Sequence, residues 1–130
     1  AIRIAGASRD EVVHLFGENE HDYEVLGLIK DKEVFFSSID LLLHPASKEA
    51  FGMVITEAMT AGVPVLCSTE CGASELIDDE LGEHLPFSAE NESWLLAAKR
   101  LLGKPFPLPS FSRTWAQVSH EYLELYQKHI

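Results

Sequence analysis

The stretch of sequence that decides the fold is residues 41–68, LLLHPASKEAFGMVITEAMTAGVPVLCS. Its first apolar run, residues 41–44, is typical of a buried parallel strand and stops at Pro45. A helical pattern follows at residues 52–61 and stops at Gly62, a residue suited to the position after a helix C-terminus. A second apolar run then covers residues 63–67. This strand–helix–strand order predicts a parallel sheet covered by helices.

The same alternation extends in both directions along the chain. Further strands are predicted at residues 2–5, 23–26 and 85–87, and further helices at 9–17, 31–38, 73–77 and 92–102, with Asp31 as the cap of its helix. The pattern predicts the α/β class with a doubly wound, Rossmann-like parallel sheet. In such sheets, ligands bind outside the carboxyl ends of the strands.

The last part of the chain, residues 104–130, has a different composition. It opens with KPFPLPSFS, which has three prolines in nine residues and predicts an extended connector. A closing helix is predicted at residues 112–129. Its apolar residues fall on roughly one face: Trp115, Val118, Tyr122, Leu125 and Tyr126.

Length and charge bound the possible functions. A chain of 130 residues that is 46% hydrophobic can bury one core of ordinary size. The formal net charge of −11 argues against a nucleic-acid partner or an anionic membrane surface. No apolar run is long enough to span a bilayer. Because the chain starts without Met and directly in a strand-like run, we expect it to be a piece of a longer protein.

The two cysteines, Cys67 and Cys71, are too few for a disulfide framework. We interpret them as reduced thiols of a cytoplasmic protein, with a redox or zinc role as the alternative.

Two glutamates, Glu49 and Glu57, stand with seven residues between them around the predicted helix start. Glu49 lies in the loop after the first strand, and Glu57 lies about a turn and a half into the helix. The first amides of that helix, at Gly52, Met53 and Val54, have no intrahelical acceptor and can bind an anion. Each glutamate taken alone also has a non-functional interpretation. Glu49 could be a surface carboxylate stabilised by the helix dipole, and Glu57 could be a solvated helix residue.

The spacing of the two carboxylates limits the class of ligand that could contact both of them. It corresponds to roughly 12 Å if fully helical, which is too long for the acid pair of a glycoside hydrolase, at about 5 to 9.5 Å. It suits a ligand with hydroxyls at both ends and charge in the middle, such as a nucleotide sugar, because carboxylates accept hydrogen bonds from hydroxyls.

Residues 44–77, HPASKEAFGMVITEAMTAGVPVLCSTECGASELI, also resemble the signature of the retaining glycosyltransferases of family 4. That signature is E-x7-E within an EGFG…EAMA.G.PV stretch, followed by Gly-x-x-E. The flanking IRIAG, EVLGLIKDKEVFFSSIDLLLHPA and SFSRTWAQVSHEYLELYQ are similar to other parts of the same domain, so the resemblance covers nearly the whole chain. EAFG and HPA are similar to the lipopolysaccharide-core glucosyltransferases of that family.

The resemblance implies a partial C-terminal, donor-binding domain of a two-Rossmann enzyme over residues 1–130. It implies that Glu49 binds the transferred hexose and is the catalytic carboxylate. Phe51 and Gly52 would contact that sugar, Met53 and Val54 would meet the phosphates, and Glu57 would bind the ribose. The loop at Leu28, Ile29 and Lys30 would line the base. No cofactor and no essential metal are implied, and retention would proceed by front-face displacement.

The chain departs from the family pattern at three places. Ala50 stands for the usual Gly after the first glutamate, and Cys71-Gly72 stands for Gly-Gly. In the family, an N-terminal acceptor domain, and an Arg and a Lys that neutralise the pyrophosphate, come before the segment that these 130 residues resemble. We therefore expect the chain alone to bind donor weakly and to catalyse little.

In the family, the closing helix crosses back to the other domain. The resemblance therefore implies that some of the apolar face of residues 112–129 is exposed in this chain and promotes self-association.

The leading hypothesis is a hexosyltransferase part that moves a hexose from a nucleotide-diphosphate sugar to a glycan or glycolipid acceptor. The alternatives are a non-catalytic nucleotide-binding domain and a plain interaction domain. The expected location is cytoplasmic, or peripheral at the inner face of the membrane in the full-length protein. UDP with glucose or a related hexose is the favoured donor.

Overall fold

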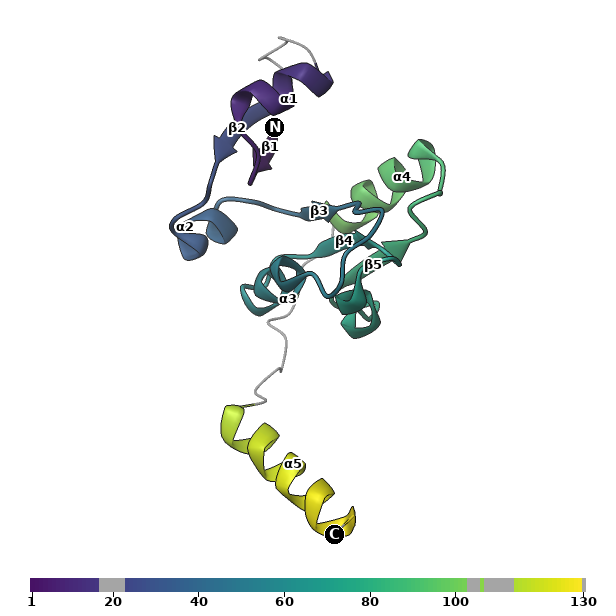
Figure 1. Ribbon diagram of the computed structural model, residues 1–130. Helices are drawn as coiled ribbons and strands as arrows, with labels where there is room; N and C mark the ends of the chain where they lie inside the picture. Colours follow the sequence, from purple (N-terminus) through teal and green to yellow (C-terminus); the bar gives the residue numbers. More distant parts are fainter. Residues whose placement is uncertain (17–22, 103–105, 107–113, 130) are drawn as a thin grey trace. The chain divides into compact units, whose positions relative to one another are not determined.

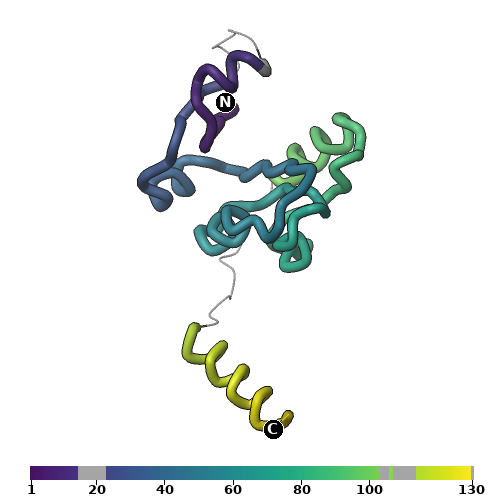
Figure 2. The backbone as a smooth tube through the Cα atoms, viewed as in Figure 1, coloured from purple at the N-terminus to yellow at the C-terminus, as the bar shows by residue number. Residues whose placement is uncertain are grey.

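The computed structural model describes residues 1–16, 23–102, 106 and 114–129. The chain divides into two units, Ala1–Asp40 and Leu41–Ile130, each described by itself (Figures 1 and 2). In the first unit, β1 (Ile2–Ala5) pairs in parallel with β2 (Tyr23–Gly27). Helices α1 (Arg9–Phe16) and α2 (Lys32–Ser37) follow these two strands in turn.

Side-chain caps begin both helices of the first unit. The Ser8 N–H donates to the Glu11 carboxylate at 2.8 Å and the Glu11 N–H donates back to the Ser8 hydroxyl at 3.4 Å, which forms a capping box for α1. Asp31 accepts from the Val34 N–H at 3.0 Å and caps α2, as the sequence predicts.

The second unit contains a three-stranded parallel sheet in the order β3 (Leu42–His44), β4 (Val65–Ser68), β5 (Gly82–Leu85). Helix α3 (Met53–Thr60) connects β3 to β4, and a 3₁₀ helix, η1 (Gly72–Leu76), follows β4. Helix α4 (Asn91–Leu102) follows β5 (Figure 1). Helix α5 (Trp115–His129) is described by itself.

The central strand β4 is the centre of the core. All four of its side chains are buried. Leu66 packs with Ala97 and Leu101 of α4. Since successive strand side chains point to opposite faces, Val65 and Cys67 face the other side, the side covered by α3. The sheet is thus covered by a helix on each face, as in doubly wound folds.

Helix α3 ends in a Schellman motif. The Val63 N–H donates to the Ala58 carbonyl at 2.9 Å, and the Gly62 N–H donates to the Met59 carbonyl at 3.0 Å. Gly62 has a φ of +75°, a conformation that glycine adopts without strain. This confirms the predicted role of Gly62 and fixes where the chain turns back into β4.

The predicted fold class, α/β with parallel strands, is confirmed, but three element predictions need correction. The last strand is Gly82–Leu85 and not residues 85–87, because Pro86 has no N–H to continue the ladder. Residues 73–76 belong to the 3₁₀ helix η1 and not to an α-helix, and Ile77 is the extended residue that follows it. The predicted burial of residues 41–44 is wrong, because Leu43 is 52% exposed and the other three residues are only half-buried, since α4 packs on β4 and β5.

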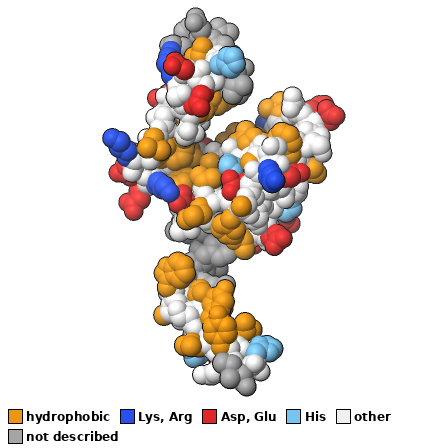
Figure 3. Space-filling model, in the orientation of Figure 1, with side chains coloured by type: hydrophobic (Ala, Val, Ile, Leu, Met, Phe, Trp, Pro, Cys, Tyr) orange, Lys and Arg blue, Asp and Glu red, His pale blue; other side chains and the backbone are white. Residues whose placement is uncertain are grey.

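The closing helix begins at Trp115, where Thr114 and Gln117 form a second capping box. Most of its apolar side chains are exposed, as Figure 3 shows along the helix. They include Trp115, Tyr122, Leu123, Leu125 and Tyr126, while Val118 is half-buried. Apart from Phe106, the predicted Pro-rich connector lies outside the described residues. Of the helices that the structure describes, none has the length and apolar character needed to cross a bilayer.

We expect Leu66→Ala to lower the free energy of unfolding by about 2–5 kcal/mol, because it leaves a cavity at a fully buried site between β4 and α4. The matched control is Leu96→Ala on α4, whose side chain is 49% exposed and whose loss should cost far less. Urea unfolding followed by circular dichroism measures both. Equal losses for the two variants would contradict this assignment of the core.

The thiol of Cys67 gives a second prediction. Burial, with a smaller effect from the neighbouring Cys71 thiol, raises the pKa of Cys67 to about 12. Because the thiol stays protonated in the folded protein, its contribution to stability is full below the unfolded pKa and is lost as the pH rises towards the folded one. We expect the urea midpoint to fall between pH 8.5 and pH 10.5, and to fall less in Cys67→Ala. An identical pH dependence in the variant would refute this.

Candidate functional site

The loop at residues 45–51 leaves β3 at its carboxyl end and carries Glu49. The backbone of Glu49 pairs in parallel with that of Cys71, and its N–H donates to the Glu70 carbonyl at 3.3 Å. The half-buried side chain accepts a hydrogen bond from the Phe51 N–H at 3.4 Å. Contacts with backbone atoms therefore fix Glu49 in place, near the end of the loop and just before α3.

Gly52 is the N-cap of α3 and has a φ of +86°. A Cβ atom at this residue would lie 3.0 Å from Ile55 Cδ1 and 3.3 Å from Glu49 Cγ. Only glycine fits here without strain, and its absent side chain lets that of Glu49 lie against the helix start. Because Gly52 itself is buried, Met53 and Val54 are the residues through which the helix start meets solvent.

No side chain of the described residues caps α3. The first amides of an α-helix lack intrahelical acceptors and carry the positive end of the helix dipole. Met53 is 68% exposed and Val54 is half-buried. This helix start can therefore accept an anionic group, beside the Glu49 carboxylate.

Glu57 lies four residues after Met53 on α3 and is half-buried. Residues four apart share one face of a helix, so Glu57 lies on the face that begins with the exposed Met53. The loop and α3 thus bring together the predicted residues Glu49, Phe51, Gly52, Met53, Val54 and Glu57 in one continuous segment of the second unit.

The segment from the last residue of β4 to the start of η1, residues 68–73, packs against this loop. The buried Ser68 hydroxyl donates to the Ala46 carbonyl, and the Ala73 N–H donates to the Phe51 carbonyl at 2.7 Å. A Cβ atom on Gly72 would lie 2.5 Å from the Ala50 carbonyl oxygen. Ser68 was not predicted to have a role, because its contact with Ala46 joins residues 22 positions apart.

The departures from the family pattern have a structural explanation. No described non-glycine residue has a positive φ, so Ala50 occupies its position without backbone strain. Cys71 has an ordinary φ of −95° and a buried side chain. Of the usual Gly-Gly pair, the second glycine is the one that the close approach of Ala50 requires, and the chain keeps it as Gly72.

Three further predicted residues belong to the first unit. Leu28 is 83% exposed, Ile29 is half-buried and Lys30 is exposed, all just after Gly27 at the end of β2. Their grouping with the Glu49 loop stays a prediction.

His44, at the end of β3, has a buried Nε2 atom without a hydrogen-bond partner among the described residues.

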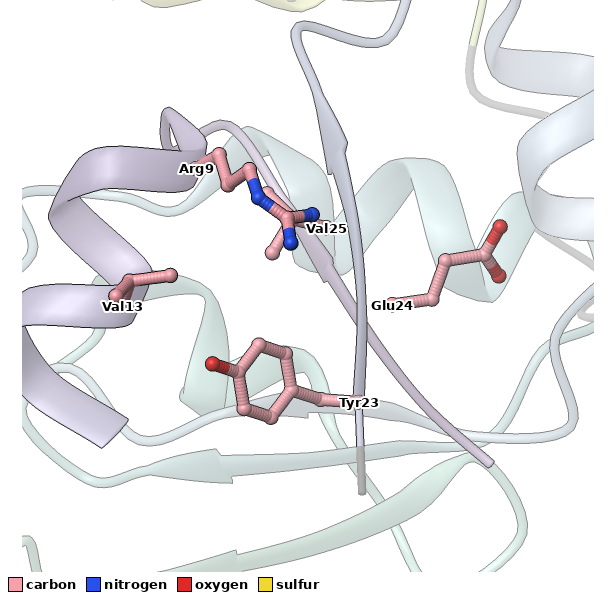
Figure 4. A pocket seen from close by; sticks show the side chains of 5 residues that line it. All are labelled: Arg9, Val13, Tyr23, Glu24 and Val25. Atoms are coloured by element: carbon pink, nitrogen blue, oxygen red, sulfur yellow. The ribbon is translucent and has the colours of Figure 1, made fainter. Parts of the chain in front are cut away.

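A separate hollow of about 220 Å³ lies in the first unit, between α1 and β2. Figure 4 shows Arg9 and Val13 from the helix facing Tyr23 and Val25 of the strand, while Glu24 points to the opposite side. There Glu24 pairs with Arg3 at 3.0 Å. The hollow contains none of the predicted site residues and gives no support to a site of its own.

No group of three or more His, Cys, Asp or Glu side chains in the described ranges is placed to hold a metal ion. The expectation that no metal is required stays a prediction.

Comparison with known proteins adds independent information. Residues 3–110 match the family described as glycosyl transferases group 1. The chain is 37% identical over 97 residues to the lipopolysaccharide glucosyltransferase WaaG of Escherichia coli K12, covering 72% of this chain and 24% of that protein. It is 30% identical over 97 residues to the alpha-1,3/1,6-mannosyltransferase ALG2 of Kluyveromyces lactis, covering 75% of this chain and 16% of that protein.

The fold also has a parallel among solved structures. The crystal structure of HepE from Anabaena in complex with UDP-glucose matches 92% of this chain and 35% of that chain, with a TM-score of 0.58 and 20% identity. The chain therefore spans about a quarter or less of these curated relatives, and about a third of the solved structure. With most of its residues matched by the family model, the chain belongs to the glycosyl transferases group 1 family.

Proposed function

We propose that this chain is the donor-binding part of a hexosyltransferase that moves a hexose from a nucleotide-diphosphate sugar to a glycan or glycolipid. The chain would form part of the C-terminal domain, and an N-terminal domain would hold the acceptor. The observation that carries the proposal is the Glu49 side chain lying against the uncapped start of α3, in a chain of this family.

Each part of the site suits one part of the donor. The exposed helix start at Met53 and Val54 suits the diphosphate, because uncapped amides and the helix dipole favour an anion. The Glu49 carboxylate and the backbone at Phe51 and Gly52 suit the hexose, since carboxylates accept hydrogen bonds from hydroxyls. Glu57, further along the helix face, suits the ribose.

The base and the sugar are proposed on narrower grounds. The loop at Leu28, Ile29 and Lys30 would line the base. We favour UDP-glucose or a related UDP-hexose as donor, because WaaG is named a glucosyltransferase and HepE is described with UDP-glucose bound.

The reaction would retain the anomeric configuration and require neither cofactor nor metal. The full-length protein would act in the cytoplasm, or at the inner face of the membrane, and α5 would support self-association.

The first test is nucleotide binding by the natural full-length protein, titrated calorimetrically with UDP, GDP and ADP. We expect saturable binding of at least one of them and, for that nucleotide, about tenfold weaker binding in Glu57→Ala, the effect of one hydrogen bond to a charged group. Binding of inorganic pyrophosphate, which has no ribose, should not weaken.

The matched control is Glu92→Ala, an exposed glutamate in the first turn of α4. Failure of the unaltered protein to bind any of the three nucleotides would refute the proposed function. An equal loss of nucleotide and pyrophosphate binding in Glu57→Ala would refute the ribose contact.

The second test is turnover, measured as UDP release from UDP-glucose while water or an acceptor hydroxyl takes the glucosyl group. Here Glu49→Gln should lower kcat by about 10- to 100-fold, because the amide accepts sugar hydroxyl hydrogen bonds less strongly than the carboxylate. The affinity for UDP, which has no hexose, should stay the same. A full-length protein that binds the donor and never turns it over would favour the non-catalytic alternative.

A further inference from the structure

We infer that the segment at residues 68–73, called the clamp below, positions Glu49 for its contact with the hexose, and that Ser68 and Gly72 are positioning residues. The inference rests on the proposed function. The clamp touches the Glu49 loop at four places: Ala46, Glu49, Ala50 and Phe51.

Ser68 holds the beginning of the loop. Its side chain is fully buried at the end of β4, where the hydroxyl donates to the Ala46 carbonyl and lies 3.3 Å from Cys71 Sγ. Removing the hydroxyl leaves the Ala46 carbonyl, in a part-buried position, without this partner, and the backbone has to move to find another. Ser68 thus fixes the loop three residues before Glu49.

Glu70 holds the loop at Glu49 itself, through its main chain. Its carbonyl accepts from the Glu49 N–H at 3.3 Å, while its carboxylate accepts from the Phe87 N–H at 2.9 Å, just after β5. The main-chain partner of Glu49 is therefore itself tied to the chain just after β5. Glu49 is thus held, through Glu70, by the chain that leaves β5.

Gly72 sets how closely the Glu49 loop approaches the clamp. Its φ is outside the left-handed region, so its backbone accepts alanine, but the new methyl would meet the Ala50 carbonyl oxygen at 2.5 Å and the Phe51 Cα at 3.3 Å. Both contacts are with backbone atoms, which cannot rotate away as a flexible side chain does. Alanine here pushes the loop outward, and Gly72 is exposed, so the core is left intact.

Helix α3 has separate support. Ile55, Ala58 and Met59 are fully buried against the sheet unit, so a shift of the loop leaves the helix and its Glu57 in place. Release of the clamp should therefore weaken the hexose contact of Glu49 and spare the nucleotide contacts of α3. Loss of stability alone would reduce both in the same proportion.

The test compares Ser68→Ala and Gly72→Ala in the natural full-length protein. The measurements are kcat for UDP release from UDP-glucose, and calorimetric affinity for UDP. We expect kcat to fall by about 10- to 100-fold in each, the scale of an ångström-sized misplacement of a reacting group. Affinity for UDP should change by less than about threefold. The matched control is Ser74→Ala, a buried serine of η1, with kcat unchanged.

Two outcomes would overturn the inference. One is UDP-glucose turnover at the unaltered rate in Gly72→Ala, the variant that leaves the core intact. The other is a parallel fall of kcat and UDP affinity in both variants, which would indicate general destabilisation. If the unaltered protein neither binds UDP nor turns over UDP-glucose, the proposed function itself fails, a result distinct from the other two.

Discussion

The burial of β4 on both faces is the constraint on which the second unit depends. Leu66 needs the cover of α4, and its neighbours Val65 and Cys67 need the cover of α3 on the other face. To supply that cover, the chain has to leave β3, cross the face of the sheet as α3, and turn back at Gly62 into β4. This path places the start of α3 at the carboxyl ends of the strands. The burial that stabilises the unit therefore also places the candidate site, as in other parallel α/β sheets.

The sequence predicted those elements of the fold whose signals are local. Asp31 caps its helix, Gly62 ends α3, and the apolar run before Ser68 is fully buried, all as expected. The prediction failed for β5, whose residues GEHL have neither an apolar run nor a clear alternation. That strand forms because Gly82 allows a close approach to the Val65 backbone, a contact across the sheet that no local pattern records. The exposure of Leu43 depends in the same way on which strands α4 covers.

A similar division applies to the candidate site. The spacing of Glu49 and Glu57, and the glycine between them, could be recognised from the sequence because all three belong to one short segment. The resemblance could also flag Cys71-Gly72 as a departure from Gly-Gly, but it could not say which of the two glycines matters. Only the distance from Gly72 to Ala50 decides that. The partnership of Ser68 with the Ala46 carbonyl is likewise long-range, and a serine after an apolar strand carries no signal of it.

The charges around the site explain why amides should bind the phosphates while carboxylates bind the sugar hydroxyls. A diphosphate would enter a chain with a net charge of −11, next to carboxylates at Glu49 and Glu57. Distant acidic residues matter little, since salt screens charges beyond about 8–10 Å, but nearby carboxylates repel phosphate oxygens directly. An arrangement in which amides meet the phosphates and carboxylates meet neutral hydroxyls avoids most of this repulsion. It works only if Glu49 is kept on the hexose side, and backbone hydrogen bonds can hold it there without adding a competing charge. The clamp meets this requirement, because its contacts with the loop are all made to main-chain atoms.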